Sequence, residues 1–412
     1  MQTCHLVILF VLPLSILGWN QISGSELEKA LGSDGPKLIA CTEYYPTPES
    51  LSVVFNPTEP RSAGLEAEWL QAASEAPGSL LAVDCSNHEN DNFCASHAGA
   101  SYPAIRLFQD ASPGSIYQGP KTAKPIINFL ARHRRPLVSK LTTPDEYSAL
   151  LTADEAVFIA YAPTQEQRAL IQYAAVRYRD EFTFGLVANP ALIPGEATES
   201  PPIPVVLCHR SNDAATSRLP LAEDSSTPKS SDDLAAFIEE ASRPTIAELT
   251  VSTHARSLAR GAPIVYIFAQ TTAERASLRT SLHRLATGYR DSLTIVTVNP
   301  AEFPDLPGKL GLCGAAAGDE IVEGRPAGAL HQLSKDRVYP YPCGRPVDPR
   351  SIQQWGLDVF QGRVKPWTPP GVTTSYDDLG PTRVAAAATR KISIANIPGL
   401  KIKIAGHRQD EL

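Results

Sequence analysis

The cysteines are the side chains in this sequence with the clearest chemical potential, because a thiolate can attack a disulfide or bind a metal ion. Seven occur among the 412 residues, at positions 4, 41, 85, 94, 208, 313 and 343. No two of them have the Cys-x-x-Cys spacing, and the nine histidines include no pair at i and i+4. We therefore expect no metal site and no cofactor. Disulfide bonds or isolated thiols remain as the chemistry of these cysteines.

The most informative cysteines lie in residues 80–108, LLAVDCSNHENDNFCASHAGASYPAIRLF. An apolar run that ends at Asp84 and Cys85 is typical of a strand buried on both faces. A polar loop with Cys94 follows, and Tyr102-Pro103 stands directly before a second apolar run. Proline is permitted at the first position of a strand, and an X–Pro bond there can be cis. This stretch therefore predicts strand, loop and strand around two cysteines.

The same order of elements is predicted three times along the chain. We expect helices at 65–75, 123–132, 165–178, 232–241, 273–289 and 349–361. We expect strands at 38–41, 50–55, 80–85, 104–108, 115–118, 156–161, 182–188, 205–209, 264–269, 293–299, 327–333 and 338–341. A proline precedes the fourth strand of each repeat, and each is a candidate for a cis bond: Pro103, Pro204 and Pro326. The basic residues 133–135 could form a binding patch, but we interpret them as the end of a helix, where cations are stabilising.

This arrangement resembles the thioredoxin-like a, b and b′ domains of the fungal protein disulfide isomerase family. The resemblance rests on AEWLQAA at 67–73, YPAIRLF at 102–108, IINFLARH at 126–133, VFIAYAP at 157–163 and DVFQGRVKP at 358–366. It implies an α/β fold with three tandem thioredoxin-like domains. Their expected bounds are 25–135 for a, 136–243 for b and 244–366 for b′, after a signal peptide at 1–24 and before a flexible tail at 367–412.

The resemblance also implies that the active site of the first domain is degenerate. Aligned on Pro57 and the Glu68-Trp69 pair, Glu59 and Ser62 occupy the positions of the family's two catalytic cysteines. By the same alignment, Val53 and Ala82 replace the buried Glu and Lys that serve proton transfer in the family. Thiol–disulfide exchange needs the sulfurs. We therefore expect no catalytic residue here.

The remaining cysteines have two interpretations each. Cys85 and Cys94 stand where some fungal relatives carry a non-catalytic disulfide, so the resemblance implies this pairing. Cys313 and Cys343 flank the third repeat's proline strand, and they are either a second disulfide or buried thiols. Cys41 and Cys208 are either reactive thiols or small buried residues, and free cysteines usually are the latter.

The resemblance favours a chaperone that binds unfolded or nascent secretory proteins without redox activity. In the family, the third domain carries an apolar pocket for clients, and the candidate residues here are Phe268, Leu278, Leu282, Leu285, Phe303 and Leu312. An active disulfide isomerase or reductase is the alternative, and it would need a lone thiol such as Cys41 to act. A structural or calcium-buffering protein is a second alternative, although 44 acidic residues without long runs are poorly suited to it.

Composition and the ends of the sequence bear on location and partners. The net charge of −7 argues against nucleic-acid binding. The uncharged stretch 6–18 has the length of a signal-peptide core and is too short to span a membrane. The final residues Gln409, Asp410, Glu411 and Leu412 resemble the tetrapeptide that the endoplasmic reticulum retrieval receptor binds. We expect a protein of the endoplasmic reticulum lumen that is not membrane-spanning.

Overall fold

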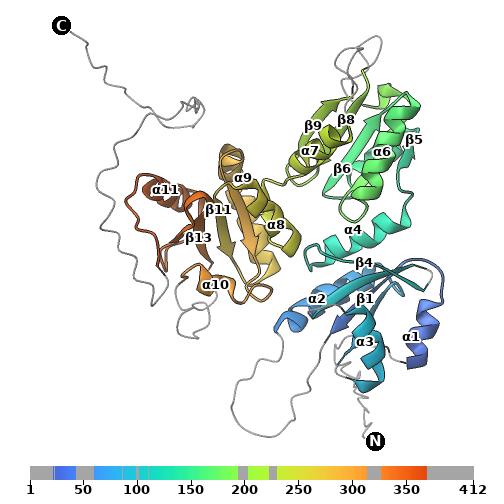
Figure 1. Cartoon of the computed structure of the whole chain (residues 1–412), viewed down its shortest axis with the longest axis horizontal. Helices are drawn as coiled ribbons and strands as arrows, with labels where there is room; N and C mark the ends of the chain where they lie inside the picture. The colour runs from blue at the N-terminus through green and yellow to red at the C-terminus, as the bar shows by residue number, and fades with distance from the viewer. Residues whose placement is uncertain are drawn as a thin grey trace, which may run out of the picture. The chain divides into compact units, whose positions relative to one another are not determined.

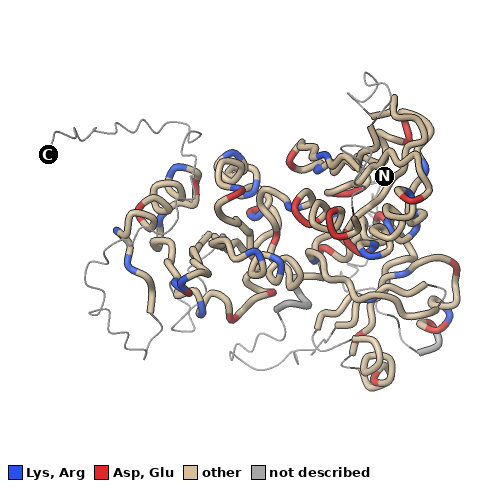
Figure 2. Tube along the Cα trace, turned by 45° about the horizontal axis from the view of Figure 1, so that its top comes forward, with Lys and Arg blue, Asp and Glu red and all other residues tan. Residues whose placement is uncertain are grey.

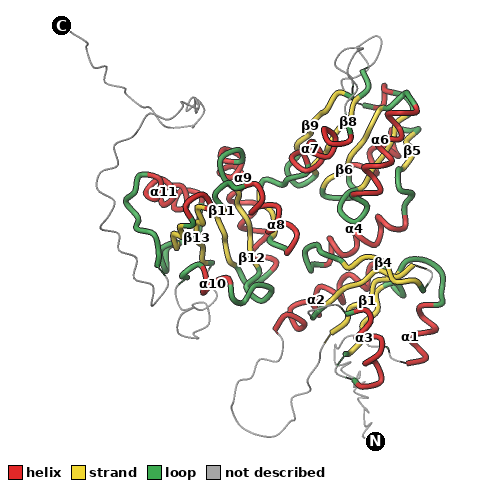
Figure 3. The backbone as a smooth tube through the Cα atoms, viewed as in Figure 1, coloured by secondary structure: helices red, strands yellow, loops and turns green. Residues whose placement is uncertain are grey.

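The structure is a computed structural model, and it describes residues 22, 24–42, 60–85, 87–98, 102–109, 111–193, 203–221, 230–312 and 326–368. The chain divides into two compact units (Figure 1). The first comprises Met1–Arg256 with Asn299–Pro304, and the second comprises Ser257–Val298 with Asp305–Leu412. The described residues form three sheets, each accompanied by helices, and Figure 3 shows these strands and helices. The predicted α/β class is therefore confirmed.

The first sheet has the order β2-β1-β3-β4, in which β1 is parallel to β2 and antiparallel to β3. Its strands are β1 (Lys37–Thr42), β2 (Leu80–Asp84), β3 (Ala104–Gln109) and β4 (Ser112–Ile116). Its helices are α1 (Gly24–Leu31), α2 (Pro60–Glu75), α3 (Asp91–His97) and α4 (Ala123–Arg134). The helices lie on both faces, because residues of α2 and α4 pack in one buried cluster and residues of α1 and α3 in another.

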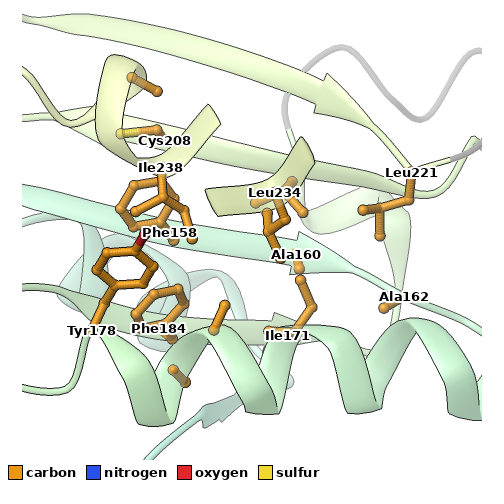
Figure 4. Close-up of a cluster of buried hydrophobic side chains, with 14 of the residues drawn as sticks. Phe158, Ala160, Ala162, Ile171, Tyr178, Phe184, Cys208, Leu221, Leu234 and Ile238 are labelled. Atoms are coloured by element: carbon orange, nitrogen blue, oxygen red, sulfur yellow. The ribbon is translucent and has the colours of Figure 1, made fainter. Parts of the chain in front are cut away.

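The second sheet has the order β5-β7-β6-β8-β9. Its strands are β5 (Ser139–Leu141), β6 (Ala156–Tyr161), β7 (Thr183–Val187), β8 (Val205–Arg210) and β9 (Ala215–Pro220), and its helices are α5 (Pro144–Leu151), α6 (Gln165–Arg177) and α7 (Ser231–Ala241). Figure 4 shows Ile171 and Tyr178 pointing from the α6 side into the core, toward Ala160 and Phe158. Cys208 lies in the same core.

The third sheet repeats the order as β10-β12-β11-β13-β14. Its strands are β10 (Ile246–Glu248), β11 (Ile264–Phe268), β12 (Thr294–Val298), β13 (Ala327–Gln332) and β14 (Arg337–Pro340), and its helices are α8 (Val251–Arg260), α9 (Thr272–Tyr289), α10 (Leu306–Lys309) and α11 (Pro349–Phe360). Basic and acidic residues occur together throughout the described chain in Figure 2, as a sequence with 37 basic and 44 acidic residues suggests.

Two sequence predictions about elements and prolines are wrong. The polar segment around Cys94 is not only a loop, because residues 91–97 form α3, where Asn87 caps the preceding 3₁₀ turn. Tyr102–Pro103 is the only cis bond in the described part of the chain, so the expectation of a cis bond at Pro204 is wrong. Trans is the default for an X–Pro bond, and the carbonyl of Pro204 accepts a hydrogen bond from the N–H of Leu221 beside the extended β8. The bond before Pro326 lies outside the described residues.

Candidate functional site

The connection between the central strand and the long helix that follows it is the place where the first repeat differs from the others. In the second repeat residues 162–164 join β6 to α6, and in the third repeat residues 269–271 join β11 to α9. In the first repeat residues 43–59 separate β1 from α2. Glu59 falls in this segment, outside the described residues. Ser62 lies in the first turn of α2, but its side chain is not described. The assignment of these two positions stays a prediction.

In the described sheet of the first repeat, β1 is an inner strand. β1 lies between β2 and β3, as β6 and β11 lie between the equivalent strands of their sheets. The strand expected at 50–55, with Val53, lies outside the described residues, so the assignment of Val53 to the family's buried Glu stays a prediction. The residue paired with Ala82 is Ala40, and both are buried. Neither Ala82 nor its partner Ala40 carries a charged side chain.

Cys41 is the thiol nearest to this central position. It follows Ala40 on β1, lies on the opposite face of the sheet, and pairs in register with Ala104, next to Pro103. Its side chain is fully buried. Burial raises the pKa of the Cys41 thiol to about 11, although the nearby charge of Arg106 lowers it. The thiol is therefore protonated at neutral pH, and a protonated thiol is a poor nucleophile.

A disulfide links Cys85 at the end of β2 to Cys94 in α3, with the two Cα atoms 5.8 Å apart. Cys94 is buried in the same cluster as Cys41. Aromatic rings stack beside the bridge, where the centroids of Phe93 and Phe108 are 5.8 Å apart. The bridge ties α3 to the sheet, which is a structural role.

The third repeat contains another bridged cysteine. Cys343 is disulfide-bonded. The cysteines at positions 4 and 313 both lie outside the described residues, so the pairing of Cys313 with Cys343 stays a prediction. Cys208, in β8, is buried and makes no disulfide.

The basic residues at the end of α4 make contacts within the first compact unit. The guanidinium of Arg132 lies 2.7 Å from Asp154, and both side chains are buried. His133 Nε2 lies 3.0 Å from Asp180 Oδ1, and Arg134 donates a hydrogen bond to the hydroxyl of Ser79. These contacts favour the interpretation of residues 133–135 as a helix end rather than as a binding patch.

Most of the predicted client-binding residues are core residues, which is a correction. Phe268 lies on β11, and Leu278 and Leu282 form the inner face of α9. The fully or nearly fully buried ones, with exposed fractions of 8% or less, are Phe268, Leu278, Leu282 and Leu312. Leu285 and Phe303 are half-buried. Helical spacing had selected the side of α9 that packs on the sheet, and this side offers no surface to a client.

Sequence reasoning missed an apolar surface on the second repeat. A hollow of about 640 Å³ lies along the outer side of α6, and its lining residues are Leu137, Val138, Ala169, Gln172, Tyr173 and Val176. Tyr173 and Val176 are 59% and 63% exposed. The signal in the sequence was a helix with apolar residues on both faces, QEQRALIQYAAVR. Within the described ranges there is no group of side chains suited to hold a metal ion, and no helix long and apolar enough to cross a membrane.

Comparison with known proteins gives a consistent result for family and fold. Residues 171–356 match the family model described as a thioredoxin-like domain. The chain is 26% identical over 323 residues to the protein disulfide-isomerase of Aspergillus oryzae, and 25% identical over 321 residues to that of Humicola insolens. Each alignment covers 77% of this chain and 58% or 60% of the relative. The chain therefore spans less than two thirds of the length of these relatives.

Among solved structures, the bb fragment of ERp72 is similar over 56% of this chain and 100% of the fragment, with 12% identity and a TM-score of 0.42. The match to the family model, together with the sheet orders above, identifies the three repeats as thioredoxin-like domains.

Proposed function

The chain belongs to the protein disulfide isomerase family, and we propose that it binds unfolded or partly folded secretory proteins as a chaperone, without catalysing thiol–disulfide exchange. The observation that carries the proposal is the state of the cysteines. The whole sequence has no Cys-x-x-Cys pair. A catalyst that oxidises or reduces its substrate has to cycle between a dithiol and a disulfide, so it needs two reactive sulfurs side by side.

The described cysteines support this interpretation. Cys85 and Cys94 are joined to each other, and Cys41 and Cys208 are buried on different sheets. With a pKa of about 11, only about one Cys41 in ten thousand is a thiolate at pH 7. Its register partners on the neighbouring strands, Val83 and Ala104, supply no carboxylate or amine that could take its proton.

An active disulfide isomerase is the second candidate, and Cys41 is the observation in its favour. This thiol lies on the central strand and pairs with the residue after Pro103. A single thiol can start a shuffling reaction by attacking a substrate disulfide, although it cannot complete an oxidation. Its burial and its raised pKa count against the reaction in the folded chain.

We place this activity in the endoplasmic reticulum lumen. The apolar stretch 6–18 and the sequence Gln409 to Leu412 support this location, as does the Cys85–Cys94 bridge, because disulfides persist in oxidising compartments. The retrieval receptor is then a second partner. A tagged chain should stay in the lumen, and the same chain ending after His407 should be secreted. Equal secretion of both chains would show that residues 409–412 do not act as a retrieval signal.

The proposal is tested by assaying exchange and chaperone activity on the same preparation. The purified chain should neither reduce insulin with a thiol donor nor speed the refolding of a scrambled disulfide-bonded protein. It should slow the aggregation of a reduced, unfolded client at stoichiometric concentration. The matched control is Cys41→Ala with Cys208→Ala. Refolding of the scrambled protein by the wild type that disappears in this variant would establish the isomerase alternative instead.

A further inference from the structure

The helix α6 carries large apolar side chains on its exposed side as well as on its buried side, whereas a surface helix usually has polar residues on its outer face. Its inner residues Ile171, Ala174 and Ala175 are buried against the sheet. On the outer side, Tyr173 and Val176 are 59% and 63% exposed. The inner face accounts for the folding of the second repeat, so the outer apolar face needs another explanation.

The outer residues of α6 form one wall of a hollow rather than an isolated pair. Leu137 and Val138, which precede β5, form the other wall, and Ala169 and Gln172 complete the lining. The hollow has a volume of about 640 Å³, which is within the range of ligand-binding pockets, roughly 300–1,000 Å³. The amide of Gln172 and the hydroxyl of Tyr173 are the polar side-chain groups in the lining. The hollow therefore suits apolar side chains and a few hydrogen-bonding groups.

The third repeat shows that the fold does not require this apolar face. α6 and α9 begin with the same capping box, from Thr164 in α6 and from Thr271 in α9. Counted from these caps, the counterpart of Tyr173 is Thr280 and the counterpart of Val176 is His283. The residues exposed on α9 around this position are small, polar or charged: Ser277, Thr280, Ser281 and Arg284. Of these two repeats, only the second therefore has exposed apolar side chains at this place.

Near the lining residues in the sequence, basic residues outnumber acidic ones, of which Glu166 lies one helical turn before Ala169. Arg177 follows Val176 directly, Lys140 comes two residues after Val138, and both are exposed. Arg135, two residues before Leu137, has a buried Nη1 without a hydrogen-bond partner in the described part of the chain. Carboxylates on a bound segment would meet opposite charge here, while lysines would meet like charge.

We propose that this hollow, defined by Leu137, Val138, Ala169, Gln172, Tyr173 and Val176, binds a short extended segment of an unfolded protein in which apolar residues are flanked by acidic ones. The inference rests on the proposed chaperone function and names its surface and the chemistry of its substrate. Six lining residues are far fewer than the roughly 20–30 per side of a stable protein–protein interface. A short segment therefore fits the surface better than a second folded chain.

The test uses the full-length chain and three fluorescent peptides of similar length. The first carries Leu, Val and Phe flanked by Glu, the second has Lys in place of Glu, and the third has the sequence of residues 391–405, KISIANIPGLKIKIA, with its three lysines. The first peptide should bind most tightly, and its advantage should shrink as salt is raised. Tightest binding by the third peptide would show that the chain's own segment is the occupant, and would overturn the proposal.

The decisive variant is Tyr173→Ser with Val176→Ser, and its matched control is Ser277→Ala with Thr280→Ala on α9. The α6 variant should lose at least about tenfold in affinity for the Glu-flanked peptide, because exposed anchor residues carry most of the energy of such contacts. The control should change affinity by less than about twofold. Both variants should keep the wild-type melting temperature, which shows that the loss is not unfolding.

The remaining outcomes separate this surface from the chaperone function. If the wild type protects a client from aggregation and the α6 variant protects it equally, the surface assignment is wrong and the function stands. If the Glu-flanked peptide binds and the α6 variant abolishes binding while no client is protected, the surface stands and the chaperone function fails. A wild-type dimer that becomes monomeric in the α6 variant would make a second copy the occupant, against the proposal.

Discussion

The helices α6 and α9 occupy the same place in two repeats and differ in what their outer faces carry. Both begin at a threonine capping box, and both bury one face on a five-stranded sheet. α6 exposes Tyr173 and Val176, whereas α9 exposes serine, threonine and arginine. Caps and inner faces are thus set by the fold, and the outer face is free to acquire a binding surface. Function in this chain is better sought where a repeat departs from its neighbour than where the two agree.

The largest difference in stability should be between a substitution on the inner face of α9 and one on the outer face of α6. Leu282 is fully buried, so Leu282→Ala should destabilise the third repeat by about 2–5 kcal/mol through lost burial and a cavity. Tyr173→Ser should change stability by no more than about 0.5 kcal/mol. Urea unfolding followed by tryptophan fluorescence measures both. If the Leu282→Ala variant were stable but no longer bound clients, the client-binding surface would have to be assigned to the third repeat.

The disulfide should make the first repeat sensitive to reductant. It closes a loop between residues nine positions apart, and the chain-entropy model gives about 2.5–3 kcal/mol for a loop of this size. Cys85→Ser with Cys94→Ser should lower the unfolding free energy of the first repeat by this amount. Dithiothreitol should do the same to the first repeat of the wild type and nothing further to the first repeat of the variant, because the bridge at Cys343 lies in the third repeat. An unchanged variant would show that the bridge does not stabilise the repeat.

The equivalence of the two caps can be checked directly. Thr164→Ala and Thr271→Ala each remove a hydroxyl that accepts a hydrogen bond from a backbone N–H, of Gln167 in α6 and Glu274 in α9. Each should cost about 1 kcal/mol, as is typical of an N-cap. Thermal unfolding of the two variants measures the difference. Unequal costs would mean that α6 and α9 are not held in the same way, which would weaken the comparison of their outer faces.

The smallest expected effect is the alkylation of Cys41 under native conditions. Its pKa is raised by burial from an ordinary value of 9.0 to about 11. Iodoacetamide labelling, read by mass spectrometry, should stay negligible at pH 8 and should increase only near pH 11 or after unfolding. The raised pKa also makes stability depend on pH, because the folded state holds the Cys41 proton more tightly than the unfolded state does. The protonated thiol therefore contributes fully to the free energy of unfolding below pH 9, and this contribution is lost as the pH rises toward 11. Rapid labelling at pH 8 would contradict the buried, protonated thiol.

The repeated order of helices and strands could be predicted from the sequence, but the contacts between these elements could not. Apolar runs predicted the central strands of the second and third repeats, and β6 begins and ends where the sequence places it, at residues 156–161. The sequence was not sufficient where polarity was the only guide, as in α3, which follows a 3₁₀ turn capped by Asn87 and carries the bridged Cys94.

Pairing between strands could not be predicted from the sequence either. The position of β1 between β2 and β3, and the pairing of Ala40 with Ala82, emerge only from the neighbouring strands. Four of the six residues predicted to bind clients, Phe268, Leu278, Leu282 and Leu312, are buried for a related reason. Helical spacing in the sequence identifies the apolar residues that pack on the sheet. Exposed apolar residues such as Tyr173 and Val176 are recognised only from the exposed fractions of their side chains in the structure.

The most direct test of non-covalent client binding is the search for a mixed disulfide. Exchange must pass through a covalent intermediate between enzyme and substrate. The chain would be mixed with a scrambled disulfide-bonded client, quenched in acid, and examined by non-reducing denaturing gel and mass spectrometry. We predict a complex before denaturation and no covalent adduct after it. A disulfide-linked adduct between Cys41 and the client would contradict the account.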